Sequence, residues 1–360
     1  MGTYYFFIWL LLMWMLEETF HVCQKEMVVG SQRIRVKPLF AFVAFAPLFF
    51  QAAFRGDVGD TYAYKQMYMD LPGSLSGLLS RMPNVTKDPG FTFFSGIIRI
   101  LFGPDPTAYL VIIALLQSLV LVLFFRKYSC NYLIALFLFY ASGDFFSWMT
   151  NGIRQFTAVI IILAGTKFVL KKDWIKIILT VLLASLFHQS ALLMLVLIPI
   201  AQGSAWNHKS LIFVFVMLVS VLFVDQFTEI LDFAMSETQY SSMVSDWNAW
   251  GDDGTNMFRV LVYSVPALIS LAGLKRIRYI DDPIINYSVN LSIMTGGIYL
   301  LSMVTSGIFI GRLPIYISLY NYVLLPWELR HLFTKTSKRI LYIVMIVLYL
   351  AFFTVQVNIG

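Results

Sequence analysis

The sequence predicts an all-α protein that crosses a membrane many times, and three observations lead to this fold class. Of the 360 residues, 59% are hydrophobic and 13% are charged, whereas a soluble domain carries about a quarter charged residues. Phe dominates the apolar runs, and Trp and Tyr stand near their ends, as an interfacial belt requires. The length suits about 11–13 transmembrane or re-entrant helices. We therefore expect one polytopic membrane domain over residues 1–360.

The apolar runs follow one another along the whole chain and leave room for two sizeable polar loops. These external loops are expected at 55–90 and 231–257. The first run begins almost at Met1 without a basic segment or a small-residue cleavage site, which favours a retained span. The runs lie near residues 3–16, 38–54, 91–102, 108–125, 131–149, 154–170, 174–200, 210–228, 258–274, 284–305, 308–325 and 340–357.

Five short loops rich in Lys and Arg set the expected orientation. They lie at 25–37, 126–127, 171–176, 275–278 and 330–339. The positive-inside rule places all five in the cytoplasm. Both termini then face outward.

Two conditions make that orientation possible. The run 91–102 must not cross, because at ~1.5 Å per residue it reaches only ~18 Å, short of a ~30 Å hydrocarbon core. The run 174–200 must break at Phe187-His188-Gln189-Ser190 and return, because a single crossing would put the later basic loops outside. On this topology the charged residues near the span ends gather on the outer face.

Those charged residues are the candidate site, because ionisable groups at membrane depth cost roughly 2.5–3.5 kcal/mol on insertion scales and usually serve function. Arg55 ends the second span and is followed by Asp57, Asp60, Tyr62 and Tyr64. A guanidinium beside carboxylates can hold a phosphate or sugar hydroxyls. Asp60 is close enough to pair with Arg55, which would keep it ionised as a base. A lone Arg here would otherwise be a snorkelling helix end.

Two further positions lie at predicted helix starts. Asp88-Pro89-Gly90 is typical of a capping Asp with Pro at the first helical position, and such a helix end also attracts anions. Arg154-Gln155 opens a span after Asn151-Gly152. A cation at a helix N-terminus opposes the macrodipole, so we expect an anion to bridge Arg154 and the helix end.

His188 is the one histidine in an apolar environment. A lone His in an apolar run is often a satisfied core residue, but at a forced helix break it becomes a candidate general base or substrate ligand. Arg312 begins the run after Thr305-Ser306-Gly307, with Gly311 allowing close approach and Pro314 loosening the helix; it can also be a snorkel.

Several kinds of chemistry are not supported. Cys23 and Cys130 are isolated, and no His, Cys and Glu cluster has metal-ligand spacing, so we expect no metal site. The net charge of +6 lies mainly in the short loops and is a topology signal. It does not indicate nucleic-acid binding.

The order of these motifs resembles a known family. Arg55 is followed by Asp60-x-x-x-Tyr64, then by Asp88-Pro89-Gly90-Phe91, Ile153-Arg154-Gln155, His188-x-Ser190-Ala191, and Arg312 shortly before an aromatic residue. This order resembles the EpsG family of bacterial exopolysaccharide proteins, which are similar to the Wzy polymerases of O-antigen and capsule synthesis. The resemblance covers about residues 1–330. The family pattern usually has Glu at the position of Asp88.

The resemblance implies a glycosyltransferase with a GT-C-like architecture, working at the outer face of the bacterial cytoplasmic membrane. It would transfer a growing glycan from undecaprenyl diphosphate to a lipid-linked repeat unit, without metal ion, nucleotide sugar or other cofactor. A chain-length regulator is a possible partner. Arg154 and Arg312 are expected to hold the diphosphate with Arg55 in support, His188 and Asp60 compete as base, and Tyr62 and Tyr64 contact sugars. Asp57, Asp88 and Gln155 complete the expected substrate-binding set.

Three alternatives remain open from the sequence. A flippase or exporter of lipid-linked oligosaccharide would need cations along a path through the inner half of the membrane, whereas the charges gather outward. A membrane O-acyltransferase also uses an intramembrane His but would need an acyl route from the cytoplasm. A scaffolding subunit would lose no function on single Arg substitutions.

Overall fold

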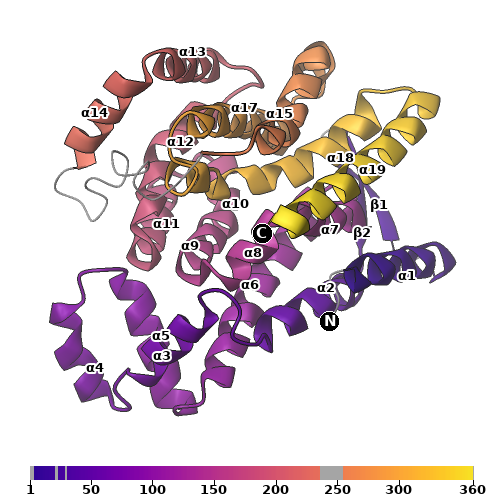
Figure 1. Ribbon diagram of the computed structural model, residues 1–360. Helices are drawn as coiled ribbons and strands as arrows, with labels where there is room; N and C mark the ends of the chain where they lie inside the picture. Colours follow the sequence, from indigo (N-terminus) through magenta and orange to yellow (C-terminus); the bar gives the residue numbers. More distant parts are fainter. Residues whose placement is uncertain (1–3, 21–22, 29–30, 236–253, 360) are drawn as a thin grey trace. The chain divides into compact units, whose positions relative to one another are not determined.

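The computed structural model describes residues 4–20, 23–28, 31–235 and 254–359 (Figure 1). It confirms an all-α membrane protein, with one small exception. A two-stranded sheet, β1 (Cys23–Val28) and β2 (Ser31–Val36), overlaps the predicted basic loop 25–37. The apolar runs to either side form α1 (Tyr5–Phe20) and α2 (Pro38–Ala53).

Four of the described helices are long and apolar enough to cross a membrane, and up to seven spans result if each bent helix pair counts as one. The long spans are α6 (Pro106–Tyr128), α9 with α10 (Ile153–Ala164 and Thr166–Leu170), α17 (Pro283–Met303) and α19 (Lys335–Ile359). Shorter apolar helices are α2, α5 (Pro89–Phe102), α11 (Trp174–Phe187) and the segment of η2 (Gln189–Leu193) and α12 (Met194–Ala201). These helices give the chain its multi-pass character.

Polar caps explain where several of these helices begin. Asp105 accepts from the backbone of Thr107 and Pro106 follows it, so α6 starts there. Asp282 and Pro283 start α17 in the same way. Asn131 accepts from the backbone N–H of Ile134 and starts α7 (Tyr132–Ala141). Each side-chain oxygen satisfies one of the otherwise unpaired N–H groups of a helix end.

Two runs predicted as single spans, 131–149 and 210–228, are bent within their length, and the run 258–274 is bent against the helix that follows it. The run 131–149 forms α7 (Tyr132–Ala141) and α8 (Asp144–Thr150), bent by 74° at Gly143, whose φ of 73° favours glycine. α13 (His208–Leu222) and α14 (Val224–Met235) are bent by 105°. α15 (Met257–Ala272) and α16 (Leu274–Ile280) are bent by 76°.

The prediction of one continuous span at 308–325 is wrong. This region forms the 3₁₀ segments η4 (Ile310–Tyr316) and η5 (Ser318–Tyr320), followed by α18 (Asn321–His331). Pro314 lies inside η4 and lacks the N–H that an α-helix needs. Arg312 therefore lies on a 3₁₀ turn instead of a span start.

The predicted break at His188 is confirmed. α11 ends at Phe187, His188 has extended backbone angles of φ −160° and ψ 121°, and η2 begins at Gln189. The two loops also have internal structure. Residues 55–90 contain α3 (Thr61–Met69), α4 (Leu75–Arg81) and η1 (Met82–Asn84). In the predicted loop 231–257, residues 236–253 lie outside the described residues. Asp246, Asp252 and Asp253 are among them.

The chain packs as two compact units. The first comprises residues 1–28, 32–195 and 343–360, and the second comprises 29–31 and 196–342. The expected single membrane domain stays a prediction. In the first unit, α2 packs against α6, α6 against α9, and α9 against α11, while α3 and α5 pack against each other and against α6 (Figure 1).

In the second unit, the central helix is α17, which packs against α13, α15, η4 and α18. Its membrane-length window is 89% buried within the structure, so its polar residues need partners. Asn290 donates to the carbonyl oxygens of Ala201 and Ser204 and accepts from the backbone of Trp206. These bonds fasten the 201–206 turn to α17.

Gly90 is the point where α5 and α11 touch. A Cβ there would lie 2.6 Å from Leu186 Cβ and 3.0 Å from Leu186 O, both far below ordinary contact. We expect Gly90→Ala to push α5 away from α11 and to cost about 1–3 kcal/mol of stability. The measurement is the melting temperature of the purified protein in detergent.

Gly73→Ala is the matched control, because a Cβ at Gly73 meets nothing within 4 Å. Its melting temperature should stay close to that of the unaltered protein. Equal melting temperatures for the two variants would contradict the close approach of α5 and α11.

Candidate functional site

Asp88 stands in an unusual backbone conformation just before α5. Its φ of 50° and ψ of 55° are left-handed, and its side chain does not bond to the helix N-terminus. Instead its Oδ2 accepts from Nη1 of Arg154 at 2.9 Å, and the carboxylate is only 1% exposed. The capping role that the sequence allowed is therefore not what this carboxylate does; it forms a buried ion pair.

Arg154 is the second residue of α9, which begins at Ile153 directly after Gly152. Its side chain is 29% exposed and its guanidinium carbon lies 5.9 Å from the centre of the Tyr64 ring. The sequence predicted an anion beside this helix N-terminus, and the structure supplies one from within the chain, the Asp88 carboxylate. A guanidinium has five N–H donors, so one bond to Asp88 leaves it able to bind further acceptors.

The break at His188 places a second polar group beside this pair. His188 Nδ1 lies 2.7 Å from Ser190 Oγ, and Gln155 Nε2 donates to the same oxygen at 3.4 Å. Gln155 is the residue after Arg154, so the first turn of α9 bonds both to Asp88, through Arg154, and to Ser190, through Gln155. The backbone N–H of Gln189 also faces the Asp88 carboxylate.

Aromatic packing holds these segments in place. Phe91 and Phe94 of α5 contact the ring of Phe187 at centroid distances of 6.5 and 5.9 Å. Phe91 also contacts Tyr109 of α6, which stacks on Tyr68 at 4.5 Å. This buried cluster lies beneath the site and joins α3, α5, α6 and α9 through Ile153. Because a packed cluster of this kind deforms little, it fixes where Asp88, Arg154 and His188 stand.

Arg55 completes the described polar groups. Its Nε donates to Thr61 Oγ1 at 3.0 Å and its Nη1 to the carbonyl oxygen of Ala52. The expected Arg55–Asp60 pair does not form among the described residues. Asp60 is exposed just before α3, and the Thr61 hydroxyl takes the Arg55 hydrogen bond instead.

Some buried polar atoms at this site lack a partner of ordinary hydrogen-bond geometry among the described residues. They are Arg55 Nη2 and Asp88 Oδ1. The Tyr109 hydroxyl has no partner within strict hydrogen-bond geometry but interacts with the Ser95 side chain, and electrostatically with Arg55, Arg154 and Tyr64. An unmet buried polar group costs about 1–3 kcal/mol. A donor and an acceptor left unmet together are what a ligand with both hydroxyl and phosphate oxygens can use.

Burial shifts the ionisation of the groups in the 55–90 loop. It raises the pKa of Asp88, against the opposing effect of Arg154. It raises the pKa of Tyr64, again opposed by Arg154, and it lowers the pKa of Arg55. The site is thus less polar than water and strengthens any charge interaction within it.

Three other predicted site residues, Asp57, Tyr62 and Arg312, are exposed. Asp57 forms an exposed ion pair with Lys65 at 2.7 Å, and the Tyr62 side chain is 60% exposed. Arg312 belongs to the second unit, where it is exposed on η4. The expectation for Gly311 beside it is confirmed, because a Cβ there would lie 2.6 Å from Thr255 Oγ1.

Sequence reasoning missed Tyr109 and Gly59, and it named Ser190 only as part of the His188-x-Ser190-Ala191 motif, without a role. Tyr109 carries no motif of its own, and only tertiary packing brings it to the site. Gly59 has a φ of 56°, and a Cβ there would lie 2.2 Å from Asn151 Oδ1, so it joins the 55–61 turn to the start of α9. A glycine between Asp57 and Asp60 is the sequence feature that could have indicated a tight turn there.

The fold and the site together define a multi-pass membrane protein with a buried Asp–Arg pair and a histidine beside it. Comparison with family models matches residues 39–358 to the EpsG family. The chain belongs to the EpsG family, and so to the polysaccharide polymerase-like membrane proteins. No curated protein matches it, and no solved structure matches it; the GT-C-like architecture stays a prediction.

The raised pKa of Asp88 gives a test by pH. The folded protein holds the Asp88 proton more tightly than the unfolded chain does. The contribution of Asp88 to the free energy of unfolding therefore increases as the pH falls toward the ordinary aspartate pKa of about 3.9. The melting temperature of the unaltered protein minus that of Asp88→Asn should therefore rise from pH 7 to pH 5.

Asp173 is the matched control of opposite sign. Its pKa is lowered, first by a hydrogen bond from Lys176, so its contribution to stability is lost as the pH falls. The corresponding difference for Asp173→Asn should stay level or shrink over the same range. A shift of the same sign for both variants would rule out the buried state of Asp88.

Proposed function

We propose that this protein is a polysaccharide polymerase that joins oligosaccharide repeat units carried on undecaprenyl diphosphate. The acceptor is a lipid-linked repeat unit and the donor is the growing chain. The reaction takes place at the outer face of the cytoplasmic membrane. The single observation that carries the proposal is the Asp88–Arg154 ion pair beside the His188 break.

Each chemical requirement of the transfer has a matching group in the first unit. An acceptor hydroxyl oxygen bonds to the anomeric carbon of the donor, and the bond from that carbon to the diphosphate oxygen breaks. The diphosphate leaves with the electron pair and needs fixed cations in a site of low polarity. Arg154 supplies one such cation and Arg55 a second, both held by hydrogen bonds to the protein.

The proton of the acceptor hydroxyl needs a base within hydrogen-bond reach. His188 is our choice, because its Nδ1 contact with Ser190 and the bond from Gln155 to Ser190 orient the ring. Asp60 is the rival base; it is exposed and forms no ion pair among the described residues. Tyr64 contacts Arg154 and would face the sugar–diphosphate junction.

Asp88 acts in this proposal as a positioning residue. A buried carboxylate holds the Arg154 side chain in one orientation, which reduces the entropy lost when a diphosphate binds. The left-handed backbone at Asp88 is consistent with this role, since strained residues cluster at functional sites. The sequence-based expectation that Arg312 helps to hold the diphosphate stays a prediction.

The first test is polymerisation by purified protein supplied with lipid-linked repeat units. We expect Arg154→Ala to lower the turnover number by roughly 10²–10³-fold, as loss of one transition-state donor does elsewhere. Arg154→Lys should recover only part of it, because an ammonium cannot bond to Asp88 and a phosphate in the same planar arrangement.

Lys176→Ala is the matched control, since it breaks an exposed ion pair with Asp173 and lies away from the site. Its activity should equal that of the unaltered protein. Full activity in Arg154→Ala combined with Arg312→Ala would refute the polymerase mechanism and favour a scaffolding role.

The second test separates the two bases. If His188 takes the proton, His188→Ala should lose at least about a hundredfold in turnover, and Ser190→Ala should shift the pH profile of activity with a smaller loss. Asp60→Asn should then stay within a few-fold of the unaltered protein. The reverse order of losses would make Asp60 the base and leave His188 a structural residue.

A further inference from the structure

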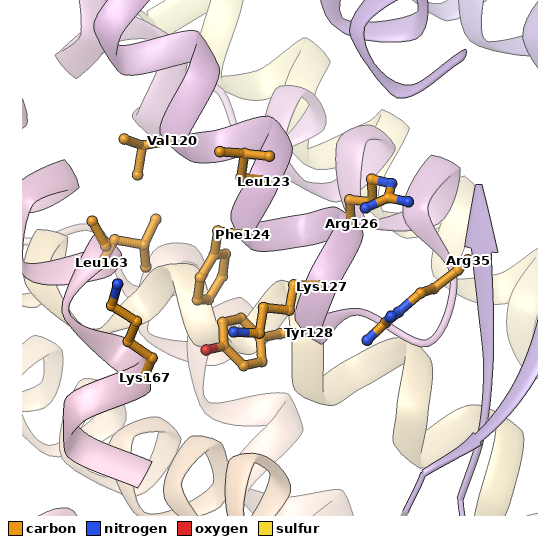
Figure 2. A pocket seen from close by; sticks show the side chains of 10 residues that line it. Arg35, Val120, Leu123, Phe124, Arg126, Lys127, Tyr128, Leu163 and Lys167 are labelled. Carbon is orange, nitrogen blue, oxygen red and sulfur yellow. The ribbon is translucent and has the colours of Figure 1, made fainter. Parts of the chain in front are cut away.

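The first unit has a cavity at the C-terminal ends of α6 and α9, whereas the candidate site lies near their N-terminal ends. The cavity of about 450 Å³ opens beside the C-terminal part of α6, the end of α9 and the start of α10 (Figure 2). Its walls come from Val120 to Tyr128 of α6, from Leu163 and Lys167, and from Arg35 of β2.

The lining is strongly basic. Four of its ten residues are cations, namely Arg35, Arg126, Lys127 and Lys167, and none of the ten is acidic. Arg126 is held in place by a bond from its Nε to the carbonyl oxygen of Val36 at 2.9 Å. Lys127 and Lys167 are exposed and line the cavity from different helices (Figure 2). Four like charges around one cavity repel each other, and a bound anion would relieve that repulsion.

An apolar ridge leads away from this basic pocket. Leu115, Leu119 and Leu123 of α6 are 55%, 39% and 49% exposed. Their spacing of four residues puts them on one face of the helix, one above the other. Leu123 also lines the pocket. A charged pocket continued by an exposed leucine ridge fits a molecule with an anionic head and a hydrocarbon tail.

The pocket and the candidate site stand at opposite ends of two spans. With a rise of ~1.5 Å per residue, Lys167 lies ~20 Å from Arg154 along α9–α10, and Lys127 lies ~27 Å from Tyr109 along α6. These lengths approach the ~30 Å thickness of a hydrocarbon core. The positive-inside rule puts the basic end in the cytoplasm, where anionic lipids attract such clusters.

We propose that this pocket binds the phosphate headgroup of an anionic phospholipid from the cytoplasmic leaflet, with the acyl chains along the Leu115–Leu123 ridge. Arg126 and Arg35 form the inner wall, and the two exposed lysines close over the phosphate. The site is separate from the polymerase chemistry and does not depend on it. It anchors the cytoplasmic ends of α6 and α9.

The test uses the full-length protein in detergent, titrated with short-chain phosphatidylglycerol, with bound lipid counted by native mass spectrometry. Phosphatidylcholine measures selectivity for a net negative headgroup. Inorganic phosphate and glycerol 3-phosphate as competitors distinguish a lipid from a soluble phosphate. We expect phosphatidylglycerol to bind preferentially and the soluble anions not to displace it at equal concentration. In Lys127→Gln with Lys167→Gln, its affinity should fall at least about tenfold.

Lys275→Gln with Lys335→Gln is the matched control, because it removes the same charge from exposed residues elsewhere. It should bind phosphatidylglycerol like the unaltered protein. Lys127→Arg with Lys167→Arg keeps the charge and should also bind, which separates charge loss from misfolding. Equal losses in the two Gln pairs, equal binding of phosphatidylcholine, or displacement by inorganic phosphate would each overturn the proposal.

Discussion

The ion pair between Asp88 and Arg154 is the interaction on which the candidate site depends. It links the end of the 55–90 loop to the first turn of a membrane-length helix, with an N–O distance of 2.9 Å and a carboxylate that is 1% exposed. Removing one partner of a buried pair leaves an uncompensated charge. Gly90 and the contact of Phe91 with Phe187 bring the end of α11 close to the start of α5. His188 is the next residue after α11, so the break lies close to the ion pair.

The two proposals concern opposite ends of the first unit. In the proposed function, the partly desolvated cations and the histidine at one end act on a diphosphate leaving group. In the further inference, the four cations and the exposed leucine ridge at the other end bind a lipid headgroup and its chains. The same helices, α6 and α9, carry both. Anything that tilts these helices would therefore change both ends together.

Glycines and breaks shape this unit as much as its apolar helices do. Gly143 with a φ of 73° bends one predicted span, and Gly59 with a φ of 56° presses the 55–61 turn against Asn151. The extended backbone at His188 interrupts another span. In a membrane, irregular backbone is tolerated where protein surrounds it or where it lines a cavity. His188 is half-buried in the protein, and the break there puts a polar side chain beside the Asp88–Arg154 pair.

The sequence alone determined the membrane class, the family and the break at His188, because apolar runs, charge placement and short motifs are local properties. It also singled out Asp88 and Arg154 as separate candidates. Only the tertiary structure decided that they pair with each other, that Gln155 bonds to Ser190, and that Tyr109 joins them. The reason is physical: a side chain far along the chain becomes a partner only when packing brings it within about 3 Å, and no local pattern encodes that distance.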